Sequence, residues 1–126
     1  MTLYLDTQVV VWISGGQSAK LTDAATAELE RAEIRISPMV VLELEYLYEI
    51  KRIIVPPQEI TSKLHLEIGA IVCDFSFPAV VAGALKETWT RDPFDRMIVA
   101  HARANNRSPL VSADRTIRKH YAEAIW

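Results

Sequence analysis

The 126-residue chain is long enough for one domain with its own core, and its 50% hydrophobic and 24% charged residues exclude a disordered or fibrous protein. The single cysteine, Cys73, excludes an internal disulfide, no apolar run reaches the ~18 residues of a membrane span, and the N-terminus lacks the basic segment of a signal peptide. We therefore expect a soluble cytoplasmic protein, and the net charge of −2 argues against a simple nucleic-acid binder.

Short apolar runs alternate with helical segments along the chain. In chain order we predict a strand over 3–6, a helical turn over 9–13, a helix over 23–31, a strand over 34–36, helices over 38–52 and 58–68, a strand over 71–75, helices over 78–87 and 93–105, a strand over 110–111, a helix over 115–120 and a strand over 124–126. This alternation predicts an α/β protein with three α/β/α layers around a mostly parallel sheet of four to five short strands. No repeat or linker divides it, so residues 1–126 are predicted to be a single domain.

The predicted helix over 93–105 opens with two carboxylates. Asp92 suits the N-cap, because its side chain can accept from the free N–H groups of the first turn, and Pro93 then occupies the first helical position. Asp95 falls one turn after Asp92. The two acids could serve only as caps at the positive end of the helix dipole, or they could belong to a functional site.

A third acid lies on an otherwise apolar helix face. Met39, Glu43, Tyr46 and Ile50 form one stripe of the helix that is predicted to begin after Ser37. An ionised carboxylate among apolar neighbours is costly unless it is paired. Glu43 could pair with an arginine, reach water at the edge of the stripe, or take part in a site.

The predicted topology brings four acids to one edge of the sheet. Asp6 ends the first strand, and Asp114 follows the fourth. Ligands of parallel sheets bind outside the carboxyl ends of the strands, where the helices that bear Glu43 and Asp95 also begin. If the first and fourth strands are neighbours, these four carboxylates converge.

Four converging carboxylates need either protons or a cation. A set of oxygen ligands without Cys or His spacing favours Mg²⁺ or Mn²⁺, which would polarise a phosphoryl oxygen and activate a water. The chain has no Walker A, G-x-G-x-x-G or G-x-S-x-G motif, so hydrolysis of a phosphodiester by water is favoured. Residues 91–120 hold seven basic and three acidic side chains, a balance that could hold a polyanion.

Four motifs in this order resemble a known family. They are Tyr4-Leu5-Asp6-Thr7, Ser37-Pro38 with Leu42-Glu43-Leu44, Arg91-Asp92-Pro93-Phe94-Asp95-Arg96, and Val111-Ser112-Ala113-Asp114. Their order and spacing are similar to those of PIN-domain ribonucleases, and more narrowly to the VapC toxins of type II toxin–antitoxin pairs. The resemblance covers nearly the whole chain and implies a PIN-like fold.

The resemblance also implies a set of site residues. Asp6, Glu43, Asp95 and Asp114 would hold Mg²⁺ or Mn²⁺ and activate water against RNA. Asp6 and Asp95 are expected to bind the main ion directly, while Glu43 and Asp114 act through waters or a second ion. Asp92 is interpreted as a helix cap that supports the ligands.

Partners follow from the same resemblance. It implies a VapB antitoxin whose C-terminal tail covers the active groove, and a homodimer, with Trp12, Tyr46 and Leu47 as candidate contacts. Arg96 and Arg115 are expected to hold the RNA backbone.

Some residues depart from the family pattern. Gln8 and Thr90 stand where histidine is frequent, and Leu42 stands where tryptophan is frequent, which bears on substrate choice and partner fit. Two other functions are conceivable for a fold of this class. A receiver-like domain would need paired acids after the first strand and a lysine following a late strand, whereas Asp6 is alone and no lysine lies between Lys86 and Lys119. A non-catalytic RNA- or protein-binding member of the same fold would be favoured by loss of an acid, and all four are present.

Overall fold

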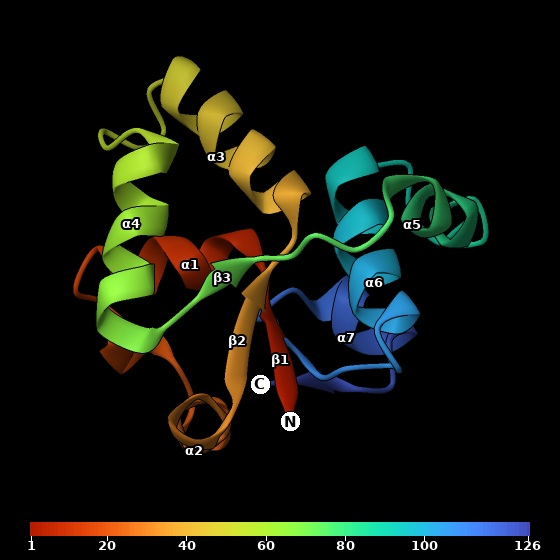
Figure 1. The fold of residues 1–126 in the computed structure, drawn as a ribbon, viewed down its shortest axis with the longest axis horizontal. Coiled ribbons are helices and arrows are strands. Elements are labelled where there is room, and N and C mark those ends of the chain that lie inside the picture. Colours follow the sequence, from red (N-terminus) through yellow and green to blue (C-terminus); the bar gives the residue numbers. More distant parts are fainter.

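A five-stranded sheet forms the centre of the computed structural model, which describes residues 1–126 (Figure 1). Its strands are β1 (Thr2–Leu5), β2 (Glu33–Ile36), β3 (Ile71–Val72), β4 (Leu110–Val111) and β5 (Ala124–Ile125). Their order is β3-β2-β1-β4-β5, and every neighbouring pair is parallel. The predicted α/β class is confirmed, with a sheet that is parallel throughout.

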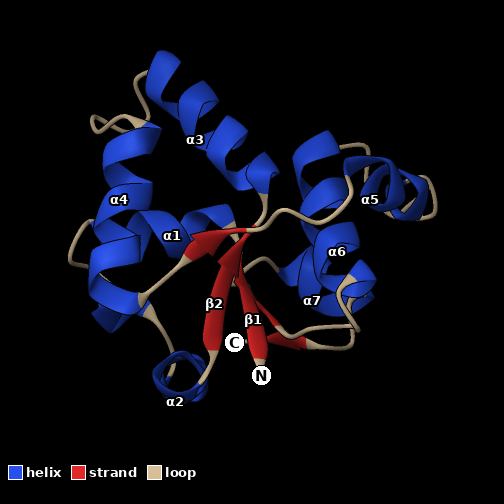
Figure 2. Cartoon of the chain, viewed as in Figure 1, coloured by secondary structure: helices blue, strands red, loops and turns tan.

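Helices lie on both sides of this sheet (Figure 2). They are α1 (Thr7–Ser14), α2 (Asp23–Arg31), α3 (Pro38–Glu49), α4 (Pro57–Ile68), α5 (Phe77–Ala84), α6 (Pro93–Ala104) and α7 (Arg115–His120), with a short 3₁₀ helix, η1, at Ser18–Lys20. α1, α3 and α4 pack on one another, while α5 packs on α6, which also contacts α3. No helix is both long and apolar enough to cross a lipid bilayer.

The predicted caps start their helices as expected. The hydroxyl of Thr22 accepts from the N–H of Ala25 at the start of α2. The hydroxyl of Ser37 accepts from the N–H of Met39 at the start of α3, where a proline occupies the first helical position. Each cap satisfies an N–H that has no partner within its helix, so these starts depend on a few neighbouring residues.

The core lies on both faces of the central strands. The side chains buried there come from all three inner strands: Leu3, Tyr4, Leu5, Ile34, Ile36, Leu110 and Val111. Burial of one large apolar side chain contributes about 1.5–3 kcal/mol, so this layer dominates the stability of the sheet. A smaller cluster of Val80, Ala84, Met97 and Ala100 joins α5 to α6.

The strand order places a topological switch point at β1. From β1 the chain continues to β2 and β3 on one side of the sheet and returns to β4 and β5 on the other. Tyr4 and Leu5 pair with Leu110 and Val111, so the carboxyl ends of β1 and β4 lie side by side. In sheets of this kind the crevice beyond such a point is the usual ligand site.

Three predicted boundaries differ from the structure by three residues each. α3 ends at Glu49 rather than near residue 52, because Lys51 adopts a left-handed conformation with φ of 62° that a helix cannot continue through. β3 ends at Val72 rather than residue 75, although the N–H of Cys73 still donates to the carbonyl of Ile36. α5 ends at Ala84 instead of residue 87, where the chain turns inward and buries Glu87.

Candidate active site

Asp6 lies at the switch point, directly after β1, and it is the one buried acid of the predicted set. Its backbone N–H donates to the carbonyl of Val111 at 3.0 Å, which ties it to the end of β4. Ser112 Oγ donates to Asp6 Oδ2 at 2.7 Å, and the N–H of Thr7 donates to Asp6 Oδ1 at 2.8 Å. Both carboxylate oxygens are therefore oriented, and each keeps a further lone pair.

Thr7 connects Asp6 to Glu43. Thr7 Oγ1 donates to Glu43 Oε1 at 2.5 Å, so the first turn of α1 holds the carboxylate that α3 brings to the edge of the sheet. Glu43 makes no ion pair with an arginine. The alternative that Glu43 pairs with an arginine is therefore wrong. The Glu43 side chain is instead half-buried, and Thr7 links it to Asp6.

The first turn of α6 carries the next two acids. Asp92 Oδ1 accepts from the N–H of Phe94 at 2.8 Å and from that of Asp95 at 3.3 Å, which confirms Asp92 as the N-cap. The carboxylate of Asp95 accepts no hydrogen bond and makes no ion pair within the protein. Phe94 stacks on Tyr46 of α3 with ring centroids 6.2 Å apart, so α6 and α3 meet beside their acids.

Asp114 completes the set at the start of α7. Its Oδ1 accepts from the N–H groups of Thr116 at 2.8 Å and Ile117 at 3.0 Å, which leaves Oδ2 free. The N–H of Asp114 donates to Ser112 Oγ at 3.1 Å. Ser112 thus accepts from Asp114 and donates to Asp6, so one buried hydroxyl joins the two acids.

The acids perturb one another electrostatically. Burial raises the pKa of Asp6, and the charges of Asp114 and Asp92 raise it further against the opposing bonds from Ser112 and Thr7. Burial also raises the pKa of Glu43, with a contribution from Asp6 and Asp92.

The pKa of Asp95 is raised to about 7 by burial and then by Asp92, Asp6, Asp114 and Glu43 in that order. Repulsion of this kind requires proximity, so the five carboxylates form one electrostatic unit. These charge effects indicate that Asp6, Glu43, Asp95 and Asp114 lie near one another, with Asp92 as a fifth member, while their role as one ligand set stays a prediction.

The donor set suits a hard divalent cation in some respects and not in others. All the groups are oxygens, and none of the five ion pairs of the protein includes these acids, so no protein cation balances their charge. However, no group of three or more His, Cys, Asp or Glu side chains already has a geometry that could hold a metal ion. The chemistry of the donors fits Mg²⁺ or Mn²⁺, while their side chains are not gathered into a finished coordination shell.

The acids lie at an open edge of the protein. None of them lines the three cavities of about 560–630 Å³ that lie along α1, α3 and α4. Asp92 and Asp114 are exposed, whereas Glu43 and Asp95 are half-buried. A large substrate could therefore reach the acids without entering a closed pocket.

The expected role of Arg96 in holding a polyanion does not fit its contacts. Arg96 Nε donates to the carbonyl of Ala84 at 3.1 Å, and its Nη2 donates to that of Leu85 at 3.3 Å. These bonds tie Arg96 to carbonyls at the end of α5, of which that of Ala84 also accepts from the N–H of Glu87 at 3.1 Å. Arg115 and its neighbours on α7, by contrast, are exposed and make no ion pair.

The histidines are not ligands of this edge. His101 is buried, and its Nδ1 lies 3.1 Å from Ser37 Oγ. His65 contacts the carbonyl of Ala70, and His120 stacks on Trp89. The Nε2 of His101 is buried without a hydrogen-bond partner.

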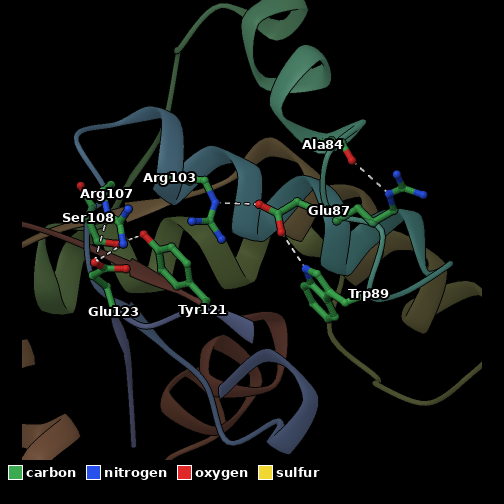
Figure 3. A network of polar contacts seen from close by, with 9 residues as sticks. Ala84, Glu87, Trp89, Arg103, Arg107, Ser108, Tyr121 and Glu123 are labelled. Atoms are coloured by element: carbon green, nitrogen blue, oxygen red, sulfur yellow. Dashed lines mark hydrogen bonds and ion pairs between the residues drawn. The ribbon is translucent and has the colours of Figure 1, made fainter. Parts of the chain in front are cut away.

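Sequence reasoning missed a polar network between α6 and the C-terminal end of the chain, built on Glu87 and Trp89 (Figure 3). Glu87 is only 5% exposed and accepts from Trp89 Nε1 at 2.6 Å and Arg103 Nε at 2.7 Å. Nothing in the local sequence Lys86-Glu87-Thr88 distinguishes this acid from an ordinary surface residue.

Comparisons with known proteins agree with this architecture. The family model described as PIN domain matches residues 3–123. No curated protein matches the chain significantly. A chain in the crystal structure of VapBC2 from Rickettsia felis bound to a DNA fragment from their promoter superposes with a TM-score of 0.65 over 99% of this chain and 96% of that chain, at 20% sequence identity, which is a likeness of fold. Because the family model spans nearly the whole chain, this protein belongs to the PIN domain family.

Proposed function

We propose that the protein is a Mg²⁺- or Mn²⁺-dependent endoribonuclease that acts in the cytoplasm as the toxin of a VapBC-type pair. PIN domains are nucleases that use divalent metal ions, which supports the reaction class. The observation that carries the proposal is the group of carboxylates at the β1–β4 switch point, whose mutual repulsion is not balanced by any protein cation. A bound divalent ion would supply the missing positive charge, polarise the scissile phosphate and lower the pKa of a water.

The contacts of each acid suggest its role. Asp6 is oriented through both oxygens and Asp95 is free of other bonds, so these two would bind the ion directly. Glu43 is oriented by Thr7 and would hold a water or a second ion. Asp114 would act through its free Oδ2, since its other oxygen caps α7.

The substrate is proposed to be RNA, held by the exposed basic side chains of α7. Arg115, Arg118 and Lys119 are exposed and unpaired, and α7 begins at Asp114, so these cations lie on the helix that borders the acids. Contacts of this kind with phosphates make binding weaken as salt concentration rises.

A VapB-type antitoxin and a second copy of the chain are the proposed protein partners. Apolar side chains of α3 and the segment after it are exposed, including Leu42 at 54%, Tyr46 at 50% and Ile54 at 90%. The structural neighbour from Rickettsia felis is a VapBC2 complex, which supports a partner of this type. Leu47 and Trp12 are half-buried, and Trp12 packs on Trp126, so Tyr46 is the better candidate contact.

Substitution of Asp6 tests the nuclease proposal. Asp6→Asn keeps a side chain that can accept from Ser112 but removes the charge at the centre of the group. We expect metal-dependent cleavage of a mixed RNA pool by the wild type, loss of cleavage in EDTA, and no cleavage by Asp6→Asn with its circular dichroism unchanged. Asp74→Asn, an exposed acid after β3 that lies outside the group, is the matched control. Full activity of Asp6→Asn, or cleavage by the wild type in EDTA, would exclude the proposed site.

A further inference from the structure

The segment 85–92, between α5 and α6, is fastened to the rest of the protein by side chains outside the acidic site. Glu87 accepts from Trp89 within the segment and from Arg103 in the last turn of α6, and both of its carboxylate oxygens are used (Figure 3). The Arg103 guanidinium in turn lies over the ring of Tyr121, 4.9 Å from its centroid. A buried carboxylate with both oxygens satisfied holds its partners in one arrangement, because any displacement leaves a buried charge unpaired.

Trp89 extends this connection to α7. Its ring stacks on His120, with centroids 5.1 Å apart and planes inclined by only 7°. His120 is the last residue of α7, and Tyr121 follows it directly. Two stacked pairs, Trp89 with His120 and Arg103 with Tyr121, therefore hold the segment before α6 against the C-terminal end of α7. Glu87 joins the two pairs, because it accepts a hydrogen bond from one member of each.

Helices α6 and α7 both carry acids of the candidate site at their N-terminal ends. Trp89 lies three residues before Asp92, the N-cap of α6, and Asp114 is the N-cap of α7. The neighbouring negative charges repel one another, which favours separation of the helix starts when no cation is bound. The contacts of Glu87 and Trp89 oppose this separation without adding a cation to the site.

We propose that Glu87, Trp89 and His120 form a brace that sets the position of the Asp92–Asp95 turn relative to Asp114. They are positioning residues for the divalent-ion site, and they act through the backbone of the segment 85–92. The functional role of the brace depends on the proposed nuclease function. Its effect on the position of the Asp92–Asp95 turn, by contrast, can be measured in the metal-free protein. Misplacement of reacting groups by about 1 Å can lower the rate on the order of 100-fold, so a small displacement of the turn is enough for a measurable effect.

His120→Ala is the cleanest test, because His120 is exposed and its removal leaves the core unchanged. In hydrogen exchange of the metal-free protein, we expect faster exchange of the amides of Phe94 and Asp95, which donate to the Asp92 cap. His120→Tyr retains a flat ring for Trp89 and is expected to restore the wild-type exchange. Lys86→Ala, an exposed change in the same segment, is the control. Unchanged exchange in His120→Ala would overturn the brace, whether or not the protein is a nuclease.

Titration with Mn²⁺ and RNA cleavage test the functional part. We expect His120→Ala to weaken Mn²⁺ affinity by about 10- to 100-fold and to lower kcat more than it raises KM, with rescue by His120→Tyr. Trp89→Phe, which keeps a smaller aromatic ring for stacking and removes the N–H that donates to Glu87, is expected to have an intermediate effect. Wild-type Mn²⁺ affinity and kcat in His120→Ala, measured beside an active wild type, would overturn the positioning role. A wild type that neither binds Mn²⁺ nor cleaves RNA would instead overturn the proposed function, with the exchange result still deciding the brace.

Discussion

Replacing Asp95 by asparagine is expected to stabilise the metal-free protein above neutral pH. Folding raises the pKa of Asp95 from 3.8 to about 7, because burial and four neighbouring carboxylates disfavour its charged form. An acid with a raised pKa binds its proton more tightly in the folded state. Its contribution to stability is therefore complete below pH 3.8 and is lost as the pH rises through about 7, and Asp95→Asn removes that loss.

The magnitude follows from the size of this rise. A change from 3.8 to about 7 corresponds to about 4 kcal/mol at about 1.4 kcal/mol per pH unit. Asp95 is only half-buried, so solvent screening reduces the destabilisation caused by its charge to about 1.5 kcal/mol. Loss of a first-turn charge at the start of α6 costs about 0.5 kcal/mol. The net gain of about 1 kcal/mol should raise Tm by roughly 3–5 °C for a domain of this size.

Thermal melts in EDTA at about pH 8 and about pH 5 measure this effect, which should be clearly smaller at the lower pH. Addition of Mn²⁺ at the higher pH should raise the Tm of the wild type, since a ligand of the folded state stabilises it, and should raise that of Asp95→Asn much less. Glu30→Gln on α2, an exposed acid away from the group, controls for removal of one charge. If Asp95→Asn melts at or below the wild type in EDTA at pH about 8, the charge repulsion inferred for this site is wrong.

Three further outcomes test individual contacts. Ser112→Ala removes the buried hydroxyl between Asp6 and Asp114 and should lower the free energy of unfolding by about 1–3 kcal/mol in urea titrations, a loss that an unchanged midpoint would contradict. Burial lowers the pKa of His101 below 6.5, so the unfolded chain takes up a proton at a higher pH than the folded protein does. The stability of the wild type relative to His101→Gln should therefore fall as the pH drops below 6.5, and a rise in relative stability would refute the lowered pKa. Arg96→Ala should destabilise the protein by about 1–2 kcal/mol with little change in the salt dependence of RNA binding. Arg115→Ala should leave the stability unchanged and reduce the slope of log K against log salt by about 1. The reverse pattern would show that Arg96 binds RNA.

The helix starts were predictable because each depends on a few consecutive residues. Thr22, Ser37 and Asp92 all cap the helices that follow them, and their oxygens accept from N–H groups two or three residues ahead. The ends of helices were less predictable. The end of α3 depends on the left-handed conformation of Lys51, and no glycine or asparagine marks this turn in the sequence.

The roles of the charged side chains needed the tertiary structure. Arg91-Asp92-Pro93-Phe94-Asp95-Arg96 is one local motif, yet Arg96 turns to the end of α5 while Asp95 faces acids from three other elements. Glu87 has the local surroundings of a surface residue and is nevertheless buried between Trp89 and Arg103. No local pattern encodes such pairs, because the partners are separated along the chain and meet only when the helices pack.

By itself, the sequence determined the alternation of strands and helices and the helix caps, because hydrophobic periodicity and capping act over one or two turns of chain. The tertiary structure alone decided that β4 lies beside β1, that Ser112 therefore meets Asp6, and that Trp89 reaches His120. These are contacts between distant segments, and they form only when burial of the core outweighs the entropy lost in bringing those segments together.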